Sequence, residues 1–495
     1  MSGLTNNKKY IGPYASLREY LEALEKFGRV LHINDIDQDQ YEATGFIYRL
    51  MEKYSAVEAP VVSFDRIKTQ GQWMQGPVLG NLYGRWEFEA LAMGIEPTGN
   101  HPQKNYKLAL NRVESLASEK GTWKTMKPIA IAGSQAPCKE IKYQGKDIDL
   151  LNFPFIKTNP ADGGCYINTG NVILVDEKHG RNVGTYRCQV KHSSKISINP
   201  EKNQDGWNFL MAMKERGEKS APAAIVLGSD PIVFALSSSK VSAMGEDELE
   251  IAGGFLGRPV EVVQCETNDI LVPANVEMVI EGVIPLDSME PEGPFGEMYG
   301  YMGAEKSKNF FMDVTAITHR ENPIFVNQFS GITRGFLTSP IETTANLKFR
   351  QKFKNFIGLH YPLETPGFCF VNINKNKAGE AMEVGNAISK SLKIAKITVV
   401  FDQDVDIHNT KEVLHALGSR WQPYDSTEIL KKAPGMGGDP SAREHGFGSR
   451  IIIDATRKTS TEGGPKEYAP MNRQCLEEGV PEIFERIDKK FGHLL

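Results

Sequence analysis

Apolar residues near the start of the chain recur at helical spacing and predict a first helix. Ser16 precedes the apolar run and Glu19 follows it by three positions, which is a capping-box pattern, and Gly28 stands where a C-cap belongs. The apolar positions are Leu17, Tyr20, Leu21, Leu24 and Phe27. The run RVLHI then predicts a strand, and residues 105–120 predict another helix. We therefore expect an N-terminal α/β domain over residues 1–125.

The pattern changes after Pro128 to short apolar runs separated by Gly, Pro, Asn and Asp. The runs include YINTGNVILV, NVGTYRCQV, AAIVLGSDPIVFAL and PVEVVQCE. Alternating runs with turn residues at such intervals are typical of antiparallel strands. Residues 126–330 are thus predicted to form a mainly antiparallel β-domain, a barrel or a sandwich.

Helix and strand patterns alternate in the last third of the chain. Residues 378–392 and 411–420 read as helices, while KITVVFD and RIIIDAT read as strands. This alternation predicts a C-terminal α/β domain over residues 331–495, with a linking helix before it and a tail after it. The Gly- and Pro-rich residues 431–450 predict a long loop near the surface or near a functional site.

Composition excludes several classes of function. The 495 residues exceed one ordinary core, and 40% hydrophobic with 24% charged residues fit a globular enzyme. The net charge is −5, and no basic cluster with interleaved aromatic residues suggests nucleic-acid binding. No apolar run reaches the roughly 20 residues that span a bilayer. The six scattered cysteines lack a CxxC pair, so we expect reduced thiols and a cytoplasmic protein.

Several common catalytic motifs are absent from the sequence. It has no GxxxxGK[ST] loop, no GxGxxG after a strand, no HExxH and no GxSxG. These absences argue against phosphoryl transfer, Rossmann-type hydride transfer, zinc hydrolysis and α/β-hydrolase chemistry.

The segment SMEPEGPFGEMYGYMG at residues 288–303 carries candidate acid–base residues. It holds Glu290, Glu292 and Glu297 among prolines and glycines that neither a helix nor a central strand tolerates, so it predicts a shaped loop. Such a loop suits general acid–base catalysis, although a solvated acidic turn has the same composition. The aromatic neighbours Phe295, Tyr299 and Tyr301 favour catalysis, because they could desolvate a carboxylate.

Residues 181–190, RNVGTYRCQV, predict a strand that carries one arginine. Alternation would place Thr185 and Arg187 on one face and Asn182 on the other. Arginine can grip a carboxylate with two parallel hydrogen bonds, but an ordinary strand-edge arginine fits the pattern equally.

Both segments together resemble the signature segments of the UbiD family of decarboxylases. The matching phrases are N-x-x-x-Y-R at 182–187 and EGPFGE at 292–297. Further family-like phrases are APC at 136–138, DLLNFPF at 149–155, RPVEVVQCETNDILVPANVEMVIEG at 258–282, VVFDQDVDIHN at 399–409 and GSRIIIDATRK at 448–458. The resemblance runs from about residue 14 to 490.

The resemblance implies a flavin enzyme with a Glu–Arg–Glu network. Prenylated FMN would lie in a central split β-barrel, and the C-terminal α/β domain would mediate oligomerisation. Arg187 would hold the substrate carboxylate or a glutamate, Glu292 would orient Arg187, and Glu297 would deliver the proton. The implied reaction is a reversible, non-oxidative decarboxylation, or carboxylation, of an aromatic or α,β-unsaturated acid. Alternatives are the catalytic subunit of a multi-subunit aromatic carboxylase and a flavin-binding homologue with an altered metal site.

The resemblance also implies how the cofactor is held. Mn²⁺ or Mg²⁺ and K⁺ would bridge its phosphate to the protein. Candidate cofactor contacts are Asn182, Thr185, Arg187, Lys202, Ser237, Ser238 and Glu248. Candidate metal ligands are Asn182, Glu248 and Asn203. Asn203 stands where the family has a histidine, so the metal site departs from the pattern, and His192 is a fallback ligand.

The remaining expectations concern the substrate and partners. His445 could face the substrate, and Arg334 could pair with an anionic ring substituent or be a surface charge. The resemblance implies a small aromatic or unsaturated acid and CO₂ as reactants, and a flavin prenyltransferase as cofactor supplier. It also implies a homodimer or homohexamer, without nucleic-acid or membrane partners.

Overall fold

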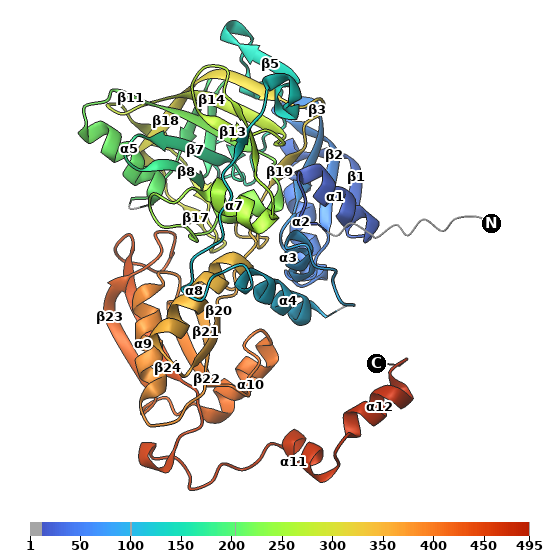
Figure 1. Ribbon diagram of the computed structural model, residues 1–495, viewed down its shortest axis with the longest axis vertical. Helices are drawn as coiled ribbons and strands as arrows, with labels where there is room; N and C mark the ends of the chain where they lie inside the picture. The colour runs from blue at the N-terminus through green and yellow to red at the C-terminus, as the bar shows by residue number, and fades with distance from the viewer. Residues whose placement is uncertain (1–11, 100, 203, 495) are drawn as a thin grey trace, which may run out of the picture.

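The structure is a computed structural model that describes residues 12–99, 101–202 and 204–494. A large body holds the N-terminal and central parts, the C-terminal α/β part lies beside it, and a tail leads away (Figure 1). Among the described residues, no helix combines the length and the apolar character needed to cross a membrane.

The N-terminal part begins with the predicted helix α1, Leu17–Lys26. Ser16 Oγ accepts from the Glu19 amide at 3.2 Å, whereas the Glu19 carboxylate accepts from the Ala15 amide at 2.9 Å. In the predicted capping box Glu19 would accept from the amide of the N-cap residue, Ser16; here it accepts from the residue before it, Ala15. The helix predicted at 105–120 is α4, which ends at Glu114. The other elements of this part are β1 Val30–Asp37, α2 Glu42–Lys53, β2 Val61–Thr69, β3 Gln72–Gly80, α3 Trp86–Ala92 and α4 Pro102–Glu114.

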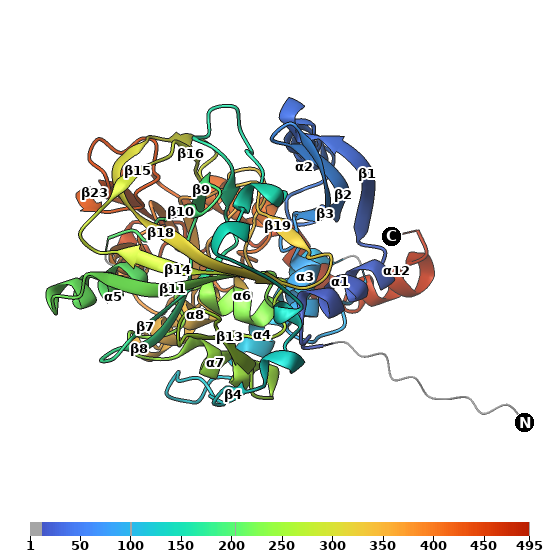
Figure 2. The same cartoon turned by 90° about the horizontal axis from the view of Figure 1, so that it is seen from above.

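A four-stranded sheet joins this part to the centre. Its order is β1-β2-β3-β19, and β19 comes from residues Phe325–Asn327, far along the chain. The sheet stands to one side of the central strands (Figure 2). The largest apolar core fills the space between them; its fully buried members include Ile47, Phe64, Ile225, Phe310 and Phe329.

The central part is a mainly antiparallel ten-stranded sheet, as its alternating pattern predicts. The main order is β6-β9-β10-β18-β14-β11-β7-β8, with β5 and β15 pairing on β18. The strands are β5 Ile141–Gln144, β6 Tyr166–Ile167, β7 Asn171–Asp176, β8 Gly180–Thr185, β9 Cys188–His192, β10 Lys195–Ile198, β11 Ser220–Leu227, β14 Met278–Pro285, β15 Glu290–Glu292 and β18 Lys306–His319.

The two ends of this sheet meet at Arg187. Strands β8 and β9 lie near opposite ends of the strand order, yet only Tyr186 and Arg187 separate them in the chain. Two residues reach only about 7 Å beyond the strand ends, so the sheet must curl back on itself. No hydrogen-bonded ladder closes it among the described strands. The prediction that Arg187 lies in a strand is wrong, because the strand breaks just before it.

Smaller elements complete the centre. Two small sheets have the orders β13-β12-β4 and β16-β17. The strands are β4 Ile129–Ala130, β12 Glu261–Gln264, β13 Leu271–Pro273, β16 Phe295–Gly296 and β17 Met302–Gly303, and the helices are α5 Asp205–Glu215, α6 Pro231–Ser237 and α7 Glu248–Leu256.

The C-terminal part has the predicted alternation of helix and strand. Its five-stranded sheet has the order β20-β21-β22-β24-β23. The loop predicted at 431–450 is shorter and covers residues 435–446, because the residues on either side of it belong to strands β23 and β24. The elements are α8 Ser339–Lys352, β20 Phe356–His360, β21 Phe368–Ile373, α9 Glu380–Ser391, β22 Ile397–Asp402, α10 Thr410–Arg420, β23 Thr427–Pro434 and β24 Phe447–Asp454.

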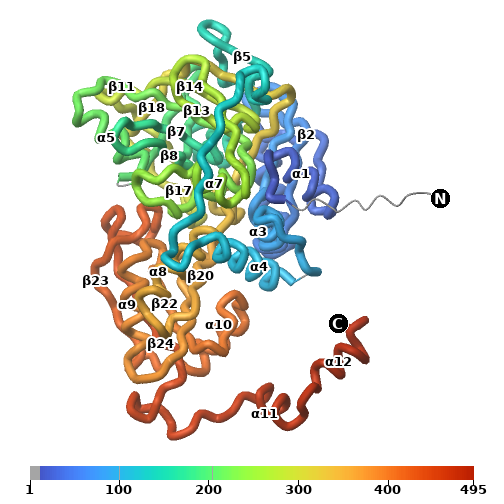
Figure 3. The backbone as a smooth tube through the Cα atoms, in the orientation of Figure 1, coloured from blue at the N-terminus to red at the C-terminus, as the bar shows by residue number. Residues whose placement is uncertain are grey.

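Residues 466–494 form a tail that leads away from the body (Figure 3). Helices α11, Asn472–Gly479, and α12, Ile483–Phe491, contain no buried residue. All six cysteines are free thiols, as predicted, and Cys475 on this tail is exposed.

Candidate active site

Arg187 holds two glutamates at the seam of the central sheet. Its Nε and Nη2 donate to Glu292 Oε1 and Oε2 at 3.1 and 2.9 Å, a bidentate contact. Its Nη1 donates to Glu297 Oε1. The structure thus brings together the three residues that the sequence singled out, although 105 positions separate Arg187 from Glu292.

The Arg187–Glu292 half of the network is buried. The Glu292 side chain has no exposed surface, and it accepts a further hydrogen bond from the Tyr166 hydroxyl at 3.0 Å. The guanidinium carbon of Arg187 lies over the Phe295 ring, 5.0 Å from the ring centroid. Burial alone would lower the pKa of Arg187, but hydrogen bonds and charge from Glu292 and Glu297 raise it above its ordinary value. Arg187 is therefore permanently charged.

Glu297 lies at the open side of the network. Its side chain is 28% exposed, and no hydrogen bond among the described residues uses its Oε2. This oxygen faces the β23–β24 loop, where a Cβ added to Gly438 would lie 3.5 Å away. The C-terminal part therefore forms one wall of the site, as the loop prediction suggested.

The Gly- and Pro-rich segment 288–303 is a shaped loop with three short strands, β15, β16 and β17. Asp162 Oδ1 accepts from the Gly296 amide at 3.0 Å, and the Gly163 amide donates to Pro294 O at 2.7 Å. These contacts fix the backbone between Glu292 and Glu297. Tyr301 is 63% exposed, so the expectation that it desolvates the carboxylates is wrong, whereas Phe295 is buried against them.

Thr185 and Ser237 lie together on the face of the sheet next to α6. Asn171 Nδ2 donates to Thr185 Oγ1 at 2.9 Å and to Ser237 Oγ at 2.7 Å. Sequence reasoning missed Asn171; its signal is a buried amide at the start of the apolar strand NVILVD. The Ser238 hydroxyl donates instead to Phe234 O of its own helix at 2.7 Å.

Glu248 is the acid of its cluster that points toward the site. Its carboxylate accepts from the Val183 amide at 2.9 Å and from Ser242 Oγ at 2.6 Å, and burial raises its pKa to about 7. Its neighbour Asp247 instead caps α7. Asn182, the residue before Val183 on β8, is also buried, and its Nδ2 has no hydrogen-bond partner among the described residues. An amide carbonyl and a carboxylate are oxygen donors that suit Mn²⁺ or Mg²⁺, so the residues present fit the implied ion.

The other predicted residues have mixed outcomes. Asn203 lies outside the described residues, and Lys202 is exposed beside it. His192 is exposed at the β9–β10 turn. His445 has a side chain that is 70% exposed, with Nε2 4.0 Å from Glu201 Oε2.

Arg334 corrects two expectations at once. It is neither a surface charge nor free for a ring substituent, because it is 3% exposed and its Nη2 lies 3.1 Å from Glu89 Oε1. It also donates to Gly84 O at 2.8 Å, so its charge and its hydrogen-bonding capacity serve the packing of α3 against α8.

Three family models match the chain. The match to the 3-octaprenyl-4-hydroxybenzoate carboxy-lyase Rift-related domain covers residues 130–333. Models of the N-terminal and C-terminal domains of the same carboxy-lyase match residues 21–103 and 337–455.

Curated relatives extend over nearly the full length. An uncharacterized protein from Aquifex aeolicus is 31% identical over 500 residues, covering 97% of this chain and 99% of the relative. A phenolic acid decarboxylase from Sedimentibacter hydroxybenzoicus is 30% identical over 475 residues, covering 92% of this chain and 94% of the relative.

Solved structures share the fold. The UbiD-class enzyme HmfF from Pelotomaculum thermopropionicum, in complex with FMN, is similar with a TM-score of 0.79, 28% identity and coverage of 95% of this chain and 98% of that chain. Vanillic acid decarboxylase from Sedimentibacter hydroxybenzoicus, in closed form, has a TM-score of 0.81, 27% identity and coverage of 96% and 99%.

Proposed function

The chain belongs to the UbiD family of carboxy-lyases, and from this premise we propose that it is a reversible, prenylated-FMN-dependent decarboxylase of an aromatic or α,β-unsaturated acid. The observation that carries the proposal is Arg187, whose guanidinium binds Glu292 and Glu297 at once. A protein that had kept the fold for another purpose would have no need of a buried Glu–Arg–Glu network at the seam of its sheet.

Arg187, Glu292 and Glu297 would have different roles because they differ in burial. Loss of CO₂ from an sp² carbon leaves an electron pair that no side chain can accept, so a bound prenylated flavin supplies the electron sink. Glu292 is buried and doubly bonded to Arg187, so it keeps the guanidinium in one orientation. Glu297 is partly exposed and has one oxygen free of hydrogen bonds, so it can hold a proton and pass it to the vacated carbon.

We propose that the remaining predicted residues hold the cofactor. Thr185 and Ser237, with Asn171 behind them, would contact it by their hydroxyls. Glu248 and Asn182 would bind Mn²⁺ or Mg²⁺, and K⁺ would share the phosphate. Lys202, Ser238 and Asn203 remain candidate contacts from the resemblance alone. The curled sheet, whose ends only two residues join, supports the split-barrel description.

Phenolic acids are the substrate class that we favour. The support is the phenolic acid decarboxylase that shares 30% identity with this chain. The burial of Arg334 removes one candidate anchor for a ring substituent. A second candidate is a catalytic subunit that needs a partner, since one structure of the vanillic acid decarboxylase was solved with a second component, truncated ShVdcD.

Two further proposals concern the cell. A flavin prenyltransferase must supply the cofactor, and the scattered cysteines favour the cytoplasm. The exposed tail favours a homodimer or homohexamer.

The test is turnover by protein co-expressed with a flavin prenyltransferase, assayed for CO₂ release from hydroxybenzoic, vanillic and cinnamic acids. Protein expressed without the prenyltransferase is the control, and the visible spectrum and cofactor mass establish loading. We expect CO₂ release only from loaded protein. Loaded protein that releases no CO₂ from any acid, with bicarbonate exchange also absent, would contradict the proposal; activity only after a second subunit is added would favour the second candidate.

A further inference from the structure

A second group of ionisable side chains lies away from Arg187, within the C-terminal part. Glu342 comes from α8, His360 from the end of β20, and His408 from the loop between β22 and α10. One ligand atom from each lies within 4.8 Å of the other two. His360 Nδ1 is 2.8 Å from Glu342 Oε1, and the two imidazole rings are 4.6 Å apart.

The group is buried and incompletely hydrogen-bonded. Glu342 is fully buried and His360 is 3% exposed, while the His408 side chain is 9% exposed. Among the described residues, neither Glu342 Oε2 nor either ring nitrogen of His408 has a hydrogen-bond partner. Buried polar atoms without a partner are rare and unfavourable, so this concentration of unused lone pairs calls for a ligand.

A protonated Glu342 beside a neutral His360 explains only part of this arrangement. Burial raises the pKa of Glu342 to about 7 and lowers the pKa of His360 to about 4. That pair makes one hydrogen bond and the Tyr361 amide donates a second to Glu342 Oε1 at 3.0 Å, but among the described residues Glu342 Oε2 and His408 Nε2 still lack a partner. Neutral imidazole is also the form that binds metals.

The neighbouring charges leave room for a cation. Arg334 is already paired with Glu89, at 3.1 Å, and Lys107 with Asp406, at 2.8 Å. Asp406 Oδ1 lies 3.5 Å from His408 Nδ1, the place of the carboxylate that orients a metal-bound histidine. Among the described residues, His360 is the only basic side chain that forms a hydrogen bond or ion pair with Glu342.

We propose that Glu342, His360 and His408 form a binding site for one divalent first-row transition-metal ion, of which Zn²⁺ is the best probe. Two imidazoles and one carboxylate are a recurrent ligand set for zinc, with bonds of about 2.0–2.2 Å. Tetrahedral bonds of this length put ligand atoms roughly 3.3 Å apart, so a modest rotation of His408 completes the site. Water can take the fourth position.

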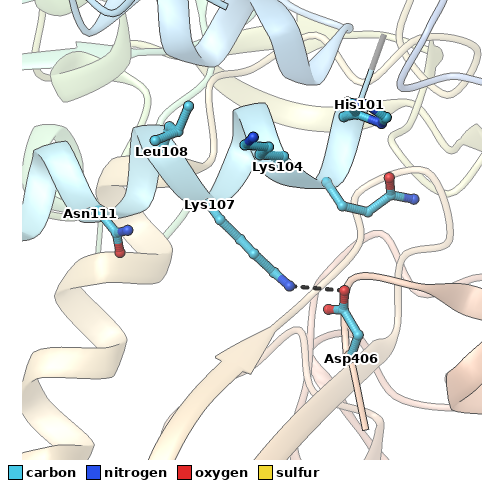
Figure 4. Close-up of a pocket in the computed structure, with 7 residues that line it drawn as sticks. His101, Lys104, Lys107, Leu108, Asn111 and Asp406 are labelled. Carbon is cyan, nitrogen blue, oxygen red and sulfur yellow. Dashed lines mark hydrogen bonds and ion pairs between the residues drawn. The ribbon is translucent and has the colours of Figure 1, made fainter. Parts of the chain in front are cut away.

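Solvent reaches Asp406, whose Oδ1 lies 3.5 Å from His408 Nδ1. An open pocket of about 590 Å³ lies between α4 and Asp406, lined by His101, Lys104 and Lys107 among others. Figure 4 shows Lys107 reaching from α4 across this pocket to Asp406. The pocket therefore reaches the residue that lies next to His408.

The site would join two parts of the molecule. The rings of Trp86 from α3 and Tyr106 from α4 pack on His360 and His408, with ring centroids 5.5 to 6.3 Å apart. A metal that fixes both histidines would fix the surface on which these N-terminal rings pack. We assign it a structural role, holding the C-terminal wall of the active site in place.

The test is zinc binding by the full-length protein, expressed without prenyltransferase, stripped with chelator and titrated with Zn²⁺. His408→Gln removes a ligand without adding charge, and His415→Gln on the exposed face of α10 is the matched control. Glu248→Gln separates this site from the cofactor metal. We expect one tightly bound equivalent and a raised melting temperature in the wild type, His415→Gln and Glu248→Gln, and their loss in His408→Gln.

Co²⁺ gives a readout that does not depend on the variants folding. We expect visible d–d absorption of wild-type protein loaded with one equivalent of Co²⁺, which competing Zn²⁺ abolishes. No stoichiometric Zn²⁺ binding by the wild type would overturn the proposal. So would binding that persists in a folded His408→Gln variant or disappears in Glu248→Gln.

Discussion

At the scale of single residues, Arg187 sets the charge balance of the active site. One guanidinium faces two carboxylates, so the network has one excess negative charge when all three groups are ionised. Uptake of one proton neutralises it, and solvent reaches Glu297 but not Glu292. This difference in exposure is why the proposed function gives proton delivery to Glu297, the residue beside the open wall.

Arg187→Lys tests whether the fork geometry matters beyond the charge. A lysine ammonium cannot bind both oxygens of Glu292 and also reach Glu297, so the two carboxylates lose their fixed separation. We expect kcat/KM to fall by about 100-fold or more, as for loss of a preorganised group, with flavin content unchanged. Wild-type kcat/KM in a fully loaded variant would show that charge alone is sufficient.

The resemblance to the UbiD family identified these three residues through the phrases N-x-x-x-Y-R and EGPFGE, whereas their composition alone also fitted an acidic turn and a strand-edge arginine. The sequence could not show that the strand breaks before Arg187, since RNVGTYRCQV reads as one continuous run. Arg334 was misjudged because its partner Glu89 is 245 positions away. Long-range ion pairs of this kind leave no local pattern.

At the scale of elements, the loop after β15 depends on a close approach between two backbones. A Cβ on Gly163 would lie 2.1 Å from Gly293 O, whereas a Cβ on Gly164 would meet only the flexible Gln189 side chain at 3.2 Å. The glycine at 163 is thus required for the loop that carries Glu292 and Glu297.

Gly163→Ala should therefore displace that loop and lower kcat by about tenfold or more, since small misplacements of catalytic groups are costly. Gly164→Ala, next to it, should keep most activity. The measurement is kcat of both variants with equal flavin loading and comparable melting temperatures. Equal kcat for the two variants would contradict the role assigned to the close approach.

Helix α6, which carries Ser237, has a buried cap that makes its stability depend on pH. Asp230 accepts from the Ile232 and Val233 amides, and burial raises its pKa from 3.8 to about 6. The folded state therefore keeps a proton that the unfolded state releases, so this group's stabilisation is lost as pH rises from about 4 to 6.

Asp230→Asn keeps the capping oxygen and removes the titration. Relative to the wild type, the variant should gain stability between about pH 4 and pH 7, by up to roughly 3 kcal/mol for two pKa units. The measurement is the difference in melting temperature between variant and wild type at about pH 5 and pH 8. A difference that stays constant with pH would exclude the raised pKa.

At the scale of the whole molecule, the C-terminal tail stands out because its helices α11 and α12 bury no residue against the rest of the chain. Helix α12 exposes Phe484 and Phe491, each 37% exposed, and Leu494 is 72% exposed. Exposed apolar side chains along one amphipathic helix are typical of a surface that another chain covers. This supports the oligomer proposed above.

Replacing Phe484 and Phe491 together by Glu should weaken assembly, because the charges would have to be buried at the interface. Light scattering coupled to size-exclusion chromatography should give a dimer or hexamer for the wild type and smaller species for the variant. Lys489→Glu is the control for charge alone. An unchanged mass for the double variant would remove the tail from the interface.

The order of the three parts could be predicted from periodicity, because the spacing of apolar positions differs from one part to the next. The curl of the central sheet could not, since it follows from the strand order, in which β8 and β9, consecutive in the chain, lie near opposite ends. The Glu342–His360–His408 group was also missed, because its members come from three elements and follow no metal-site spacing.

The most direct test of the account is decarboxylation in D₂O by fully loaded wild-type protein and by Glu297→Gln. The amide keeps the shape and the contact with Arg187 but cannot give up a proton. We predict deuterium at the vacated carbon for the wild type and, for Glu297→Gln, loss of product with unchanged flavin content. Product formation by Glu297→Gln at the wild-type rate would contradict the claim that the Glu–Arg–Glu network carries the reaction.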